Sequence, residues 1–252
     1  MNNLKISIIT VVWNNASTIK DAINSVLNQT YSNIEYIIID GASTDGTVEI
    51  VQSYGEKIDK FISEKDKGLY DAMNKGLSFA TGNIIGILNS DDFYINEFVI
   101  EKIVKEFEKK QVDSVYADLV FVRPKNLDKT VRYYDSSYFD PDKFAYGWMP
   151  AHPSFFVRKE IYEKYGVFKT DYKIAADYEL LTRFLAKNKI SYSYMKEPIV
   201  KMRMGGASTS GLKSNYILNK EIIRACREND IYTNWLMVLS KYPKKILGLL
   251  KK

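Results

Sequence analysis

Apolar residues in the first 110 positions fall into two alternating patterns. Short, nearly continuous runs rich in β-branched residues are typical of strands buried on both faces of a sheet. Apolar residues at three- and four-residue spacing between these runs indicate amphipathic helices. This alternation predicts βαβ units and an α/β fold with a mostly parallel central sheet flanked by helices. In chain order, the expected strands cover 6–13, 36–40, 60–63 and 83–88, and the expected helices cover 19–27, 47–54, 69–80 and 95–109.

The second half of the chain has a less regular pattern. It contains no internal repeat, low-complexity tract or linker, so we expect one domain over 1–232 followed by a tail over 233–252. The expected strands of this half cover 114–118, 120–122, 130–134, 154–157, 191–195 and 199–204, and the expected helices cover 158–165 and 175–187.

The tail over 233–252 mixes apolar residues with five lysines, and Pro243 interrupts it. A basic amphipathic segment of this kind suits an anionic membrane surface. A terminal helix packed on the domain has the same pattern. We favour membrane association, and the packed helix is the alternative.

Length and composition fit a folded chain with a sizeable core: 252 residues, of which 46% are hydrophobic. The net charge of +5 favours anionic partners, such as a nucleotide or a phosphate-bearing lipid. We expect no nucleic-acid partner, because no basic stripe is interleaved with aromatic residues.

The single cysteine, Cys226, excludes an internal disulfide and fits a reducing compartment. The first residues lack the layout of a signal peptide, and no apolar run reaches the ~18 residues of a membrane span. We therefore expect a cytoplasmic protein, with the tail as a means of peripheral attachment to the inner face of the cell membrane.

Polar residues follow three of the expected strands: Thr10–Asn14, Asp40 and Asn89–Asp92. The carboxyl ends of parallel strands share one edge of a sheet, where α/β proteins bind ligands. Asp91 and Asp92 repel each other unless a cation lies nearby, so a Mg²⁺ or Mn²⁺ site is one interpretation. An N-cap for the helix that follows is the other.

Two charged segments near these strand ends also have two interpretations each. Asp40 precedes Gly41 and is either a turn residue or an acceptor for the imide N–H of a uracil-like base. Asp66 and Lys67 precede an expected helix whose N-terminus favours an anion, and Gly68 permits close approach of the backbone. An ordinary charged helix entrance is the alternative.

The second half contains two candidate site residues. His152 is the only histidine and lies between Pro150 and Pro153, where it serves either a metal or phosphate, or a structural hydrogen bond. Asp177 lies near the start of the expected helix over 175–187, as a general base or as a favourable charge at the helix dipole.

Four motifs occur in order along the chain: SIITVVWN at 7–14, DGASTDGT at 40–47, GLYDAMNKG at 68–76 and LNSDD at 88–92. Through them the sequence resembles glycosyltransferase family 2, whose members have a GT-A fold, from about Lys5 to about Ser208. Each motif is weak alone, whereas their order and spacing together are specific.

The resemblance implies an inverting enzyme that moves one sugar from a nucleotide-diphosphate sugar, a UDP-sugar above all, to a hydroxyl acceptor. The acceptor is expected to be a growing saccharide or a lipid-linked molecule in cell-surface polysaccharide synthesis. It also implies a nucleotide-sugar-binding half over 1–110 and an acceptor and catalytic-base half over 111–232. Residues expected at the nucleotide-sugar are Val11, Trp13, Asn14, Asp40, Asp66, Lys67, Asn74 and Asp91; those expected at Mn²⁺ or Mg²⁺ are Asp91, Asp92 and His152; and Asp177 is the expected catalytic base.

The sequence departs from the family pattern at two positions. Asn89 stands where the metal motif usually begins with a carboxylate, so metal contact depends on Asp91. Ala176 stands where the family often has an acidic residue, which leaves Asp177 as the base and Glu179 as the alternative. The Gln-x-x-Arg-Trp motif and membrane spans of processive synthases are missing, which favours transfer of a single sugar.

Two rival functions stay open at this point. A sugar-phosphate nucleotidyltransferase would need a Gly-rich phosphate loop after the first strand, and Asn14–Ser17 is not one. A non-catalytic nucleotide-sugar-binding protein with a decayed site is the second rival, and Asn89 favours it. A Rossmann dehydrogenase is not expected, because no Gly-x-Gly-x-x-Gly follows the first strand.

Overall fold

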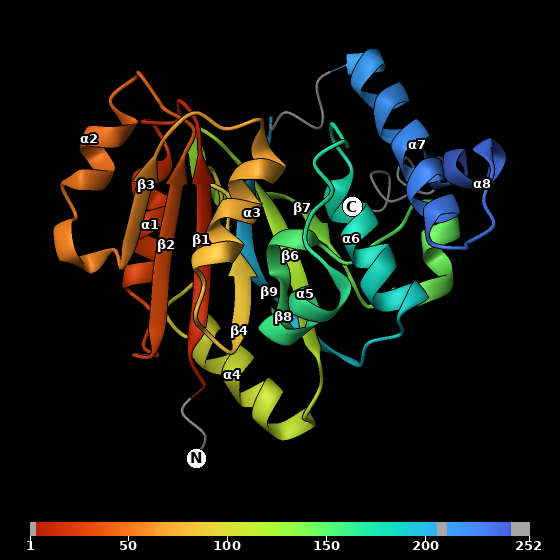
Figure 1. Ribbon diagram of the computed structural model, residues 1–252, viewed down its shortest axis with the longest axis horizontal. Helices are drawn as coiled ribbons and strands as arrows, with labels where there is room; N and C mark the ends of the chain where they lie inside the picture. Colours follow the sequence, from red (N-terminus) through yellow and green to blue (C-terminus); the bar gives the residue numbers. More distant parts are fainter. Residues whose placement is uncertain (1–3, 206–210, 243–252) are drawn as a thin grey trace.

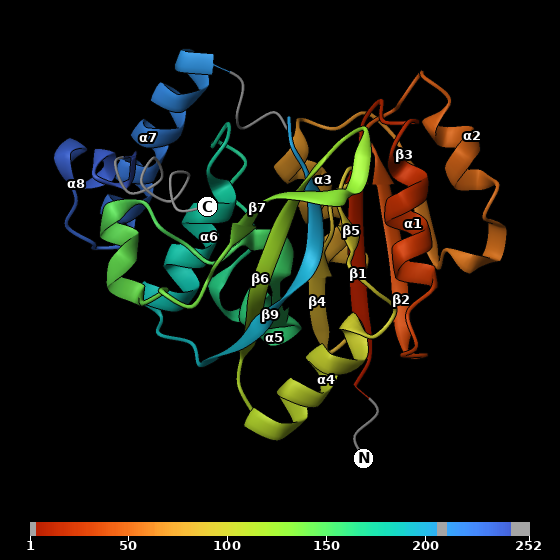
Figure 2. The same cartoon turned by 180° about the vertical axis from the view of Figure 1, so that it is seen from behind.

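The computed structural model describes residues 4–205 and 211–242 of the chain. In these ranges nine strands form one sheet, with the order β3-β2-β1-β4-β8-β6-β9-β5 and with β7 paired to β6. Helices α3, α5 and α6 cover the face of the sheet seen in Figure 1, and α1 and α4 cover the face seen in Figure 2. The predicted α/β fold, a central sheet flanked by helices, is confirmed.

The first half of the chain forms a parallel sheet. Strands β2, β1 and β4 are buried along nearly their whole length, which explains their continuous β-branched sequences. The elements are β1 (Ile6–Val12), α1 (Ile19–Leu27), β2 (Ile34–Asp40), α2 (Thr47–Gln52), η1 (Gly55–Lys57), β3 (Lys60–Ser63), α3 (Leu69–Phe79) and β4 (Ile84–Ile87). Each expected strand and helix of this half is present, with ends that differ by a few residues.

The second half adds strands in both directions. Strand β8 runs antiparallel to β4 and β6, whereas β9 runs parallel to β6, so the second half combines parallel and antiparallel pairs. The strands are β5 (Phe93–Tyr94), β6 (Ser114–Arg123), β7 (Asn126–Tyr134), β8 (Phe155–Arg158) and β9 (Tyr192–Arg203).

Two pairs of predicted short strands are single long strands. The sequence pattern predicts breaks near residues 119 and 196–198, but β6 and β9 continue through both. Their pairing shifts register around Asp118, which lies opposite Pro198. Pro198 has no backbone N–H to donate to the neighbouring strand. The register shift accommodates it, so the strand continues instead of ending there.

The helices that follow β4 differ from the prediction in three places. Helix α4 begins at Val99 rather than near Ile95, because Phe93 and Tyr94 pair with β9 as β5. The helix expected over 175–187 is α6 followed by one π-helical segment, η4. Helix α7 has no counterpart in the prediction. The elements are α4 (Val99–Lys110), η2 (Pro141–Tyr146), η3 (His152–Ser154), α5 (Lys159–Tyr165), α6 (Ala176–Leu181), η4 (Thr182–Lys187), α7 (Gly211–Glu228) and α8 (Trp235–Leu239).

Two hydrophobic clusters lie on opposite faces of the sheet. The alternation of β1 shows this, since Ile9 and Val11 belong to one cluster and Ile6 and Ile8 to the other. The first cluster extends to Val238 of α8, which is fully buried. The described part of the tail therefore packs on the domain, and the tail positions 243–252 lie outside the described residues.

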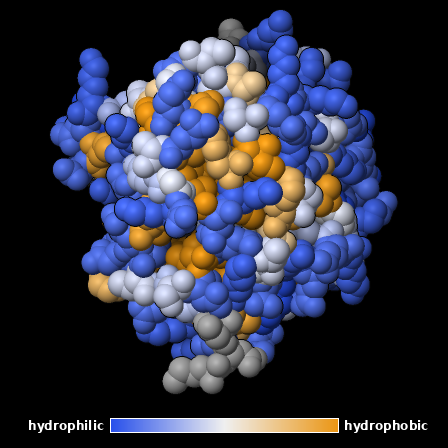
Figure 3. All heavy atoms as spheres, turned by 60° about the vertical axis from the view of Figure 1, so that its left-hand side comes forward, coloured by the Kyte–Doolittle hydropathy of each residue, from blue (hydrophilic) through white to orange (hydrophobic). Residues whose placement is uncertain are grey.

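Strand β3 forms one edge of the sheet. Figure 3 turns the side that carries α2 and β3 forward and shows apolar side chains gathered in its middle, ringed by hydrophilic ones. Lys60 of β3 is exposed, and its Nζ lies 4.8 Å from the centre of the Phe79 ring. A lysine on an edge strand opposes pairing with another chain.

Candidate active site

The loops after β1 and β2 are tied together by hydrogen bonds. The Asn14 backbone N–H donates to Ser43 Oγ at 2.7 Å, and Asn14 Oδ1 accepts from the Thr44 backbone N–H at 2.8 Å. The Ala16 N–H donates to Asp45 Oδ2 at 3.0 Å. Asn14 has φ +47°, a conformation that asparagine tolerates better than most residues. Asn14 thus fixes the shape of the loop after β1.

Asp40, at the end of β2, is fully buried. Its Oδ2 accepts hydrogen bonds from the Ser43 backbone N–H at 2.9 Å and from Ser63 Oγ at 2.6 Å. Its Oδ1 is buried and has no hydrogen-bond partner among the described residues. A buried acceptor without a donor costs about 1–3 kcal/mol, so this oxygen is placed to receive a donor from a ligand.

Trp13, Asp40 and Asp66 meet around Gly41. A Cβ on Gly41 would lie 2.6 Å from Asp66 Oδ2 and 3.4 Å from Trp13 Cδ1, so a larger residue at this position would displace the Asp66 carboxylate. Trp13 is 69% exposed at this point, which is unusual for the largest aromatic side chain. Trp13 and Asp66, from separate parts of the chain, thus both lie at the residue that follows Asp40, and Val11 lies buried in the strand that leads to Trp13.

Lys67 and Asn74 do not join this group in the expected way. The Lys67 backbone N–H donates to Asp71 Oδ2 at 3.0 Å at the start of α3, while its side chain is exposed. Asn74 Nδ2 donates to the Phe168 carbonyl at 2.8 Å, and Asn74 Oδ1 accepts from the Phe168 N–H at 3.0 Å. With both ends of its amide engaged, Asn74 fastens α3 to the segment before α6.

The loop over 89–92 is held from two sides. Asn15 Nδ2 donates to Ser90 Oγ at 2.9 Å, and Thr18 Oγ1 donates to the Ser90 carbonyl at 3.0 Å. From the other side, Arg203 Nη1 donates to the Asp91 carbonyl at 2.5 Å. These bonds fix the loop while leaving the Asp91 side chain available.

The two carboxylates of this loop differ in their surroundings. Asp91 is half-buried, and its carboxylate makes no hydrogen bond or ion pair in the part of the chain that the structure describes. Asp92 is fully buried. Burial, followed by the charge of Asp91, raises the pKa of Asp92 well above the ordinary range, and this outweighs the opposing effects of Arg203 and Asn89. The Asp91 carboxylate is therefore the accessible one of the two, and it is of the type that a hard divalent cation prefers.

No group of three or more His, Cys, Asp or Glu side chains in the described ranges is placed to hold a metal ion. The contacts that the structure gives His152, an expected metal ligand, are with Asp177 and Asn89. Its Nδ1 lies 3.2 Å from Asp177 Oδ2, and its Nε2 lies 3.4 Å from Asn89 Nδ2. The expected metal trio of Asp91, Asp92 and His152 is thus not assembled, and His152 instead joins the predicted base to the loop after β4.

Asp177 lies in the first turn of α6, and its side chain remains 18% exposed. Its Oδ1 accepts the Tyr178 backbone N–H at 2.8 Å. Glu179, the alternative base, is fully buried and paired with Arg183 at 2.9 Å and with Lys169 at 3.0 Å. A buried carboxylate held by two cations has no access to an acceptor hydroxyl, so Asp177 is the accessible carboxylate of the two.

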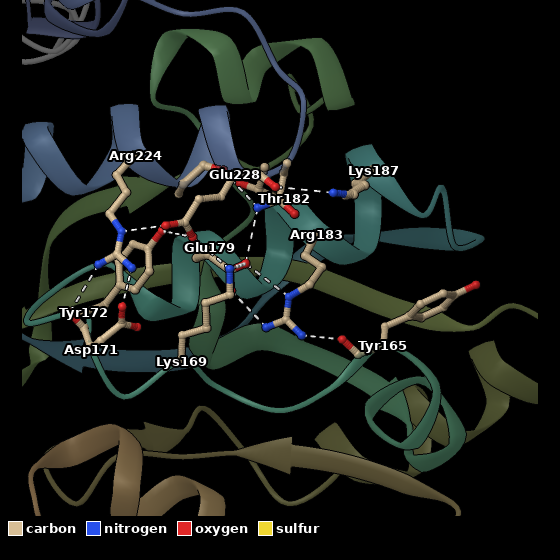
Figure 4. Close-up of polar contacts among 12 residues, drawn as sticks. Tyr165, Lys169, Asp171, Tyr172, Glu179, Thr182, Arg183, Lys187, Arg224 and Glu228 are labelled. Carbon is tan, nitrogen blue, oxygen red and sulfur yellow. Dashed lines mark hydrogen bonds and ion pairs between the residues drawn. The ribbon is translucent and has the colours of Figure 1, made fainter.

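Glu179 belongs to a charged network that joins α6 to α7 (Figure 4). Lys169 bridges Glu179 and Glu228 of α7, and Glu228 also accepts hydrogen bonds from Arg224 and Tyr172. Burial raises the pKa of Glu228, but hydrogen bonds from Lys169, Arg224 and Tyr172 outweigh it and lower the pKa to about 2.

Helix α7, which the sequence pattern does not predict, also supports the segment that carries Asp177, the predicted base. Glu221 of α7 accepts hydrogen bonds from the backbone N–H groups of Lys173, Ile174 and Ala175 at 2.7–2.9 Å. These three residues directly precede α6, so Glu221 fixes the segment from which Asp177 projects. The only sequence signal for this role is that Glu221 is an acidic residue in a late amphipathic segment. Nothing in the neighbouring sequence connects Glu221 with Asp177.

Comparisons with known proteins show the family of the chain. A model of the family described as "Glycosyl transferase family 2" matches residues 7–166. A PGL/p-HBAD biosynthesis glycosyltransferase of Mycobacterium bovis is 25% identical over 222 residues, which cover 86% of this chain and 82% of that protein. A glycosyltransferase of Rickettsia typhi is 28% identical over 230 residues, covering 86% of this chain and 70% of that protein.

Two solved structures share the fold. S. aureus TarS 1-349 in complex with UDP-GlcNAc has a TM-score of 0.69 at 18% identity and covers 91% of this chain and 68% of that one. The mannosyltransferase PcManGT of Pyrobaculum calidifontis, in complex with GDP-Man and Mn²⁺, has a TM-score of 0.62 at 16% identity. The match covers 98% of this chain and 81% of that one. The chain spans 41% of the longer TarS chain. The matched family model, the named relatives and the fold show that the chain belongs to glycosyltransferase family 2 and is a GT-A glycosyltransferase.

Proposed function

We propose that the chain transfers one sugar, with inversion, from a UDP-sugar to a hydroxyl group of a saccharide or lipid-linked acceptor. The observation that carries the donor assignment is the unpartnered, buried Oδ1 of Asp40 beside the exposed Trp13. The imide N–H of uracil is a donor of the kind this oxygen lacks, and the Trp13 ring offers a face for stacking a base. The TarS structure with UDP-GlcNAc, although distant in sequence, supports a uridine donor.

Asp91 would hold Mn²⁺ or Mg²⁺ on the diphosphate. Its free carboxylate is an oxygen ligand of the type that these ions prefer, and the Mn²⁺ in the PcManGT structure supports the assignment. When bound, such an ion neutralises the charge that develops on the leaving diphosphate. The chain's own contribution is to fix the loop through Ser90 and the Asp91 carbonyl, so that the carboxylate needs no reorganisation.

Asp177 would take the proton of the attacking hydroxyl. Its carboxylate is accessible, and the hydrogen bonds to Tyr178 and His152 fix its orientation. The reaction also gains from holding donor and acceptor in line, which is worth ~7 kcal/mol or more in well-oriented reactions.

The face formed by α7 and α8 would meet an anionic membrane that carries the acceptor. Val238 anchors α8 in the core, while Leu236 is 82% exposed and Trp235 41% exposed. Lys220 and Arg227 of α7 are exposed beside them and form no ion pair in the described part of the chain. Exposed Trp and Leu flanked by cations suit the interface of an anionic bilayer.

This proposal makes 1–232 the transferase domain, with its nucleotide-sugar half over 1–110, and makes the segment from 233 a membrane-facing element. Among the described residues, none of the helices is both long enough and apolar enough to span a bilayer. Attachment would therefore be at the surface. Co-sedimentation with vesicles of phosphatidylcholine and phosphatidylserine tests it, and binding should fall when Leu236 and Trp235 are both changed to Ser.

The enzymatic proposal is tested by release of nucleotide from UDP-, GDP- and dTDP-sugars with Mn²⁺. We expect UDP-sugars to be preferred and Asp177→Asn to abolish transfer while keeping UDP affinity. Full activity of Asp177→Asn would remove the assigned base. A protein that binds UDP but turns over none of these donors with any acceptor would be a binding protein instead.

A further inference from the structure

The two ring nitrogens of His152 face two different parts of the candidate site. Nδ1 lies 3.2 Å from Oδ2 of Asp177, on α6, and Nε2 lies 3.4 Å from Nδ2 of Asn89, in the loop after β4. The imidazole therefore connects the loop proposed to hold the diphosphate with the carboxylate proposed to act as base.

The donors and acceptors along this line select one form of the ring. Asn89 Nδ2 carries only hydrogens that it can donate, so Nε2 must present its lone pair to it. Nδ1 then carries the single ring proton and donates it to the Asp177 carboxylate, whose Oδ2 is the acceptor. One neutral tautomer thus satisfies both neighbours.

We propose that Asn89 and His152 are positioning residues: Asn89 holds His152 as the neutral Nδ1–H tautomer, which orients the Asp177 carboxylate toward the acceptor. This inference rests on the proposed role of Asp177 as base. It gives a purpose to the asparagine that stands where a carboxylate is usual. A carboxylate at position 89 would accept rather than donate, and would therefore require a proton on Nε2.

The surroundings of His152 hold the ring in place. It begins η3, in which the buried Ser154 Oγ donates to the Ala117 carbonyl at 2.6 Å and so anchors the turn on β6. Next to His152 and Asp177 lies a cavity of about 20 Å³ with mainly apolar walls, including Met73 and Phe155. A space of that size holds about one water molecule, so solvent has little access to this side of the contact.

Because His152 is the only histidine, its protonation can be read without ambiguity. The experiment is two-dimensional NMR of the full chain labelled with ¹⁵N only in histidine, recorded at pH 7.5 without metal. We expect the wild-type ring to show a proton on Nδ1 and none on Nε2. Asn89→Asp should place a proton on Nε2, and Asn89→Ala should give a mixture of both tautomers. A wild-type ring protonated on Nε2, or a spectrum unchanged by Asn89→Asp, would overturn the proposal.

Activity supplies the second readout. With UDP release from UDP-GlcNAc, His152→Phe should lower kcat about 10- to 100-fold, part of the ~10²–10⁴ that a general base contributes, with KM changed less than about threefold. His152→Asn keeps a donor near the Nδ1 position and should recover much of the loss. A fall in the melting temperature of His152→Phe with unchanged kcat would show a structural role and reject the proposal.

The two proposals fail separately. If Asp177→Asn retains full transfer, the assignment of the base is wrong and the orienting role falls with it, although the ring tautomer still reports whether Asn89 controls His152. If Asp177→Asn is inactive and His152→Phe is fully active at unchanged KM, only the inference about positioning is overturned.

Discussion

Arg203, at the end of β9, donates a hydrogen bond from Nη1 to the Asp91 carbonyl at 2.5 Å, across 112 residues of chain. Its Nη2 pairs with Asp21 of α1, and its guanidinium carbon lies 4.9 Å from the centre of the Phe93 ring. Arg203 is only 7% exposed. Its charge is used to fix the loop that carries Asp91 and is not free to contact a diphosphate.

Arg203→Lys should therefore weaken donor binding without removing a ligand contact. Lysine keeps the charge but cannot bond to Asp21 and to the Asp91 carbonyl with the same planar fork. We expect the Kd for UDP in the presence of Mn²⁺ to rise about tenfold, measured by titration calorimetry, since loss of one such bond costs about 1–2 kcal/mol. Arg227→Lys, on the exposed side of α7, is the matched control, and equal effects of the two changes would contradict this interpretation.

Asp40→Asn should change base selectivity. The amide presents a donor where the carboxylate Oδ1 presents an acceptor, so it conflicts with the imide N–H of uracil and suits the unprotonated N3 of cytosine. We expect UDP affinity to fall about 10- to 100-fold, as for hydrogen bonds to charged groups, and CDP affinity to rise relative to UDP. Calorimetry with both nucleotides decides, and an unchanged preference for UDP would exclude Asp40 from base recognition.

Chelation should separate metal-dependent from metal-independent donor binding. With EDTA we expect wild-type UDP affinity to fall and added Mn²⁺ to restore it, because Asp91 would hold such an ion on the diphosphate. Asp91→Ala should have the low affinity in both conditions. Glu97→Ala, which removes an exposed carboxylate nearby in sequence, should behave as wild type. A full Mn²⁺ response in Asp91→Ala would place the ion elsewhere.

Glu221→Gln should lower both stability and turnover, with donor binding unchanged. Glutamine keeps one acceptor oxygen, so at least one of the N–H groups of Lys173, Ile174 and Ala175 loses its partner. We expect the free energy of unfolding to fall by about 1–3 kcal/mol and kcat to fall with it, because the segment before Asp177 loosens. Urea unfolding and steady-state kinetics test this against Lys220→Gln, an exposed neighbour on α7. Unchanged kcat in a destabilised variant would show that Glu221 does not act on Asp177.

Glu35 should make stability depend on pH in the acid range. Burial raises its pKa, but hydrogen bonds from Lys5, Ser7 and Thr81 outweigh burial and lower the pKa from 4.5 to about 2. A lowered carboxyl pKa contributes stability that is complete above about pH 4.5 and is lost as pH falls toward 2.

Glu35→Gln should remove this contribution. We expect the variant to be about 1–3 kcal/mol less stable than wild type at pH 7, and the difference to shrink between pH 4.5 and 2, the window set by the shift of Glu35. Urea unfolding at several pH values between 7 and 3 measures it. A stability difference that does not change with pH would mean that Glu35 contributes through packing alone.

Local sequence determined the elements of the first half. Strands β1, β2 and β4 are buried on both faces of the sheet. Burial on both faces favours continuous runs of β-branched residues, and such a run can be recognised within a few residues of sequence. The same reasoning placed Asp40 and Asp91 at one edge, because parallel strands end on the same side. The four ordered motifs were enough to identify the family.

Tertiary structure decided the rest of the site. Whether Asn74 meets a ligand or the Phe168 backbone, and whether His152 turns toward Asp91 or Asp177, depends on how α3, η3 and α6 pack across the sheet. Glu221 reaches Ala175 only because α7 lies against α6, 46 residues later in the chain. A residue's tendency to form a strand or helix arises from near neighbours and can be read from them, whereas a contact between distant side chains depends on packing geometry that no short stretch of sequence records.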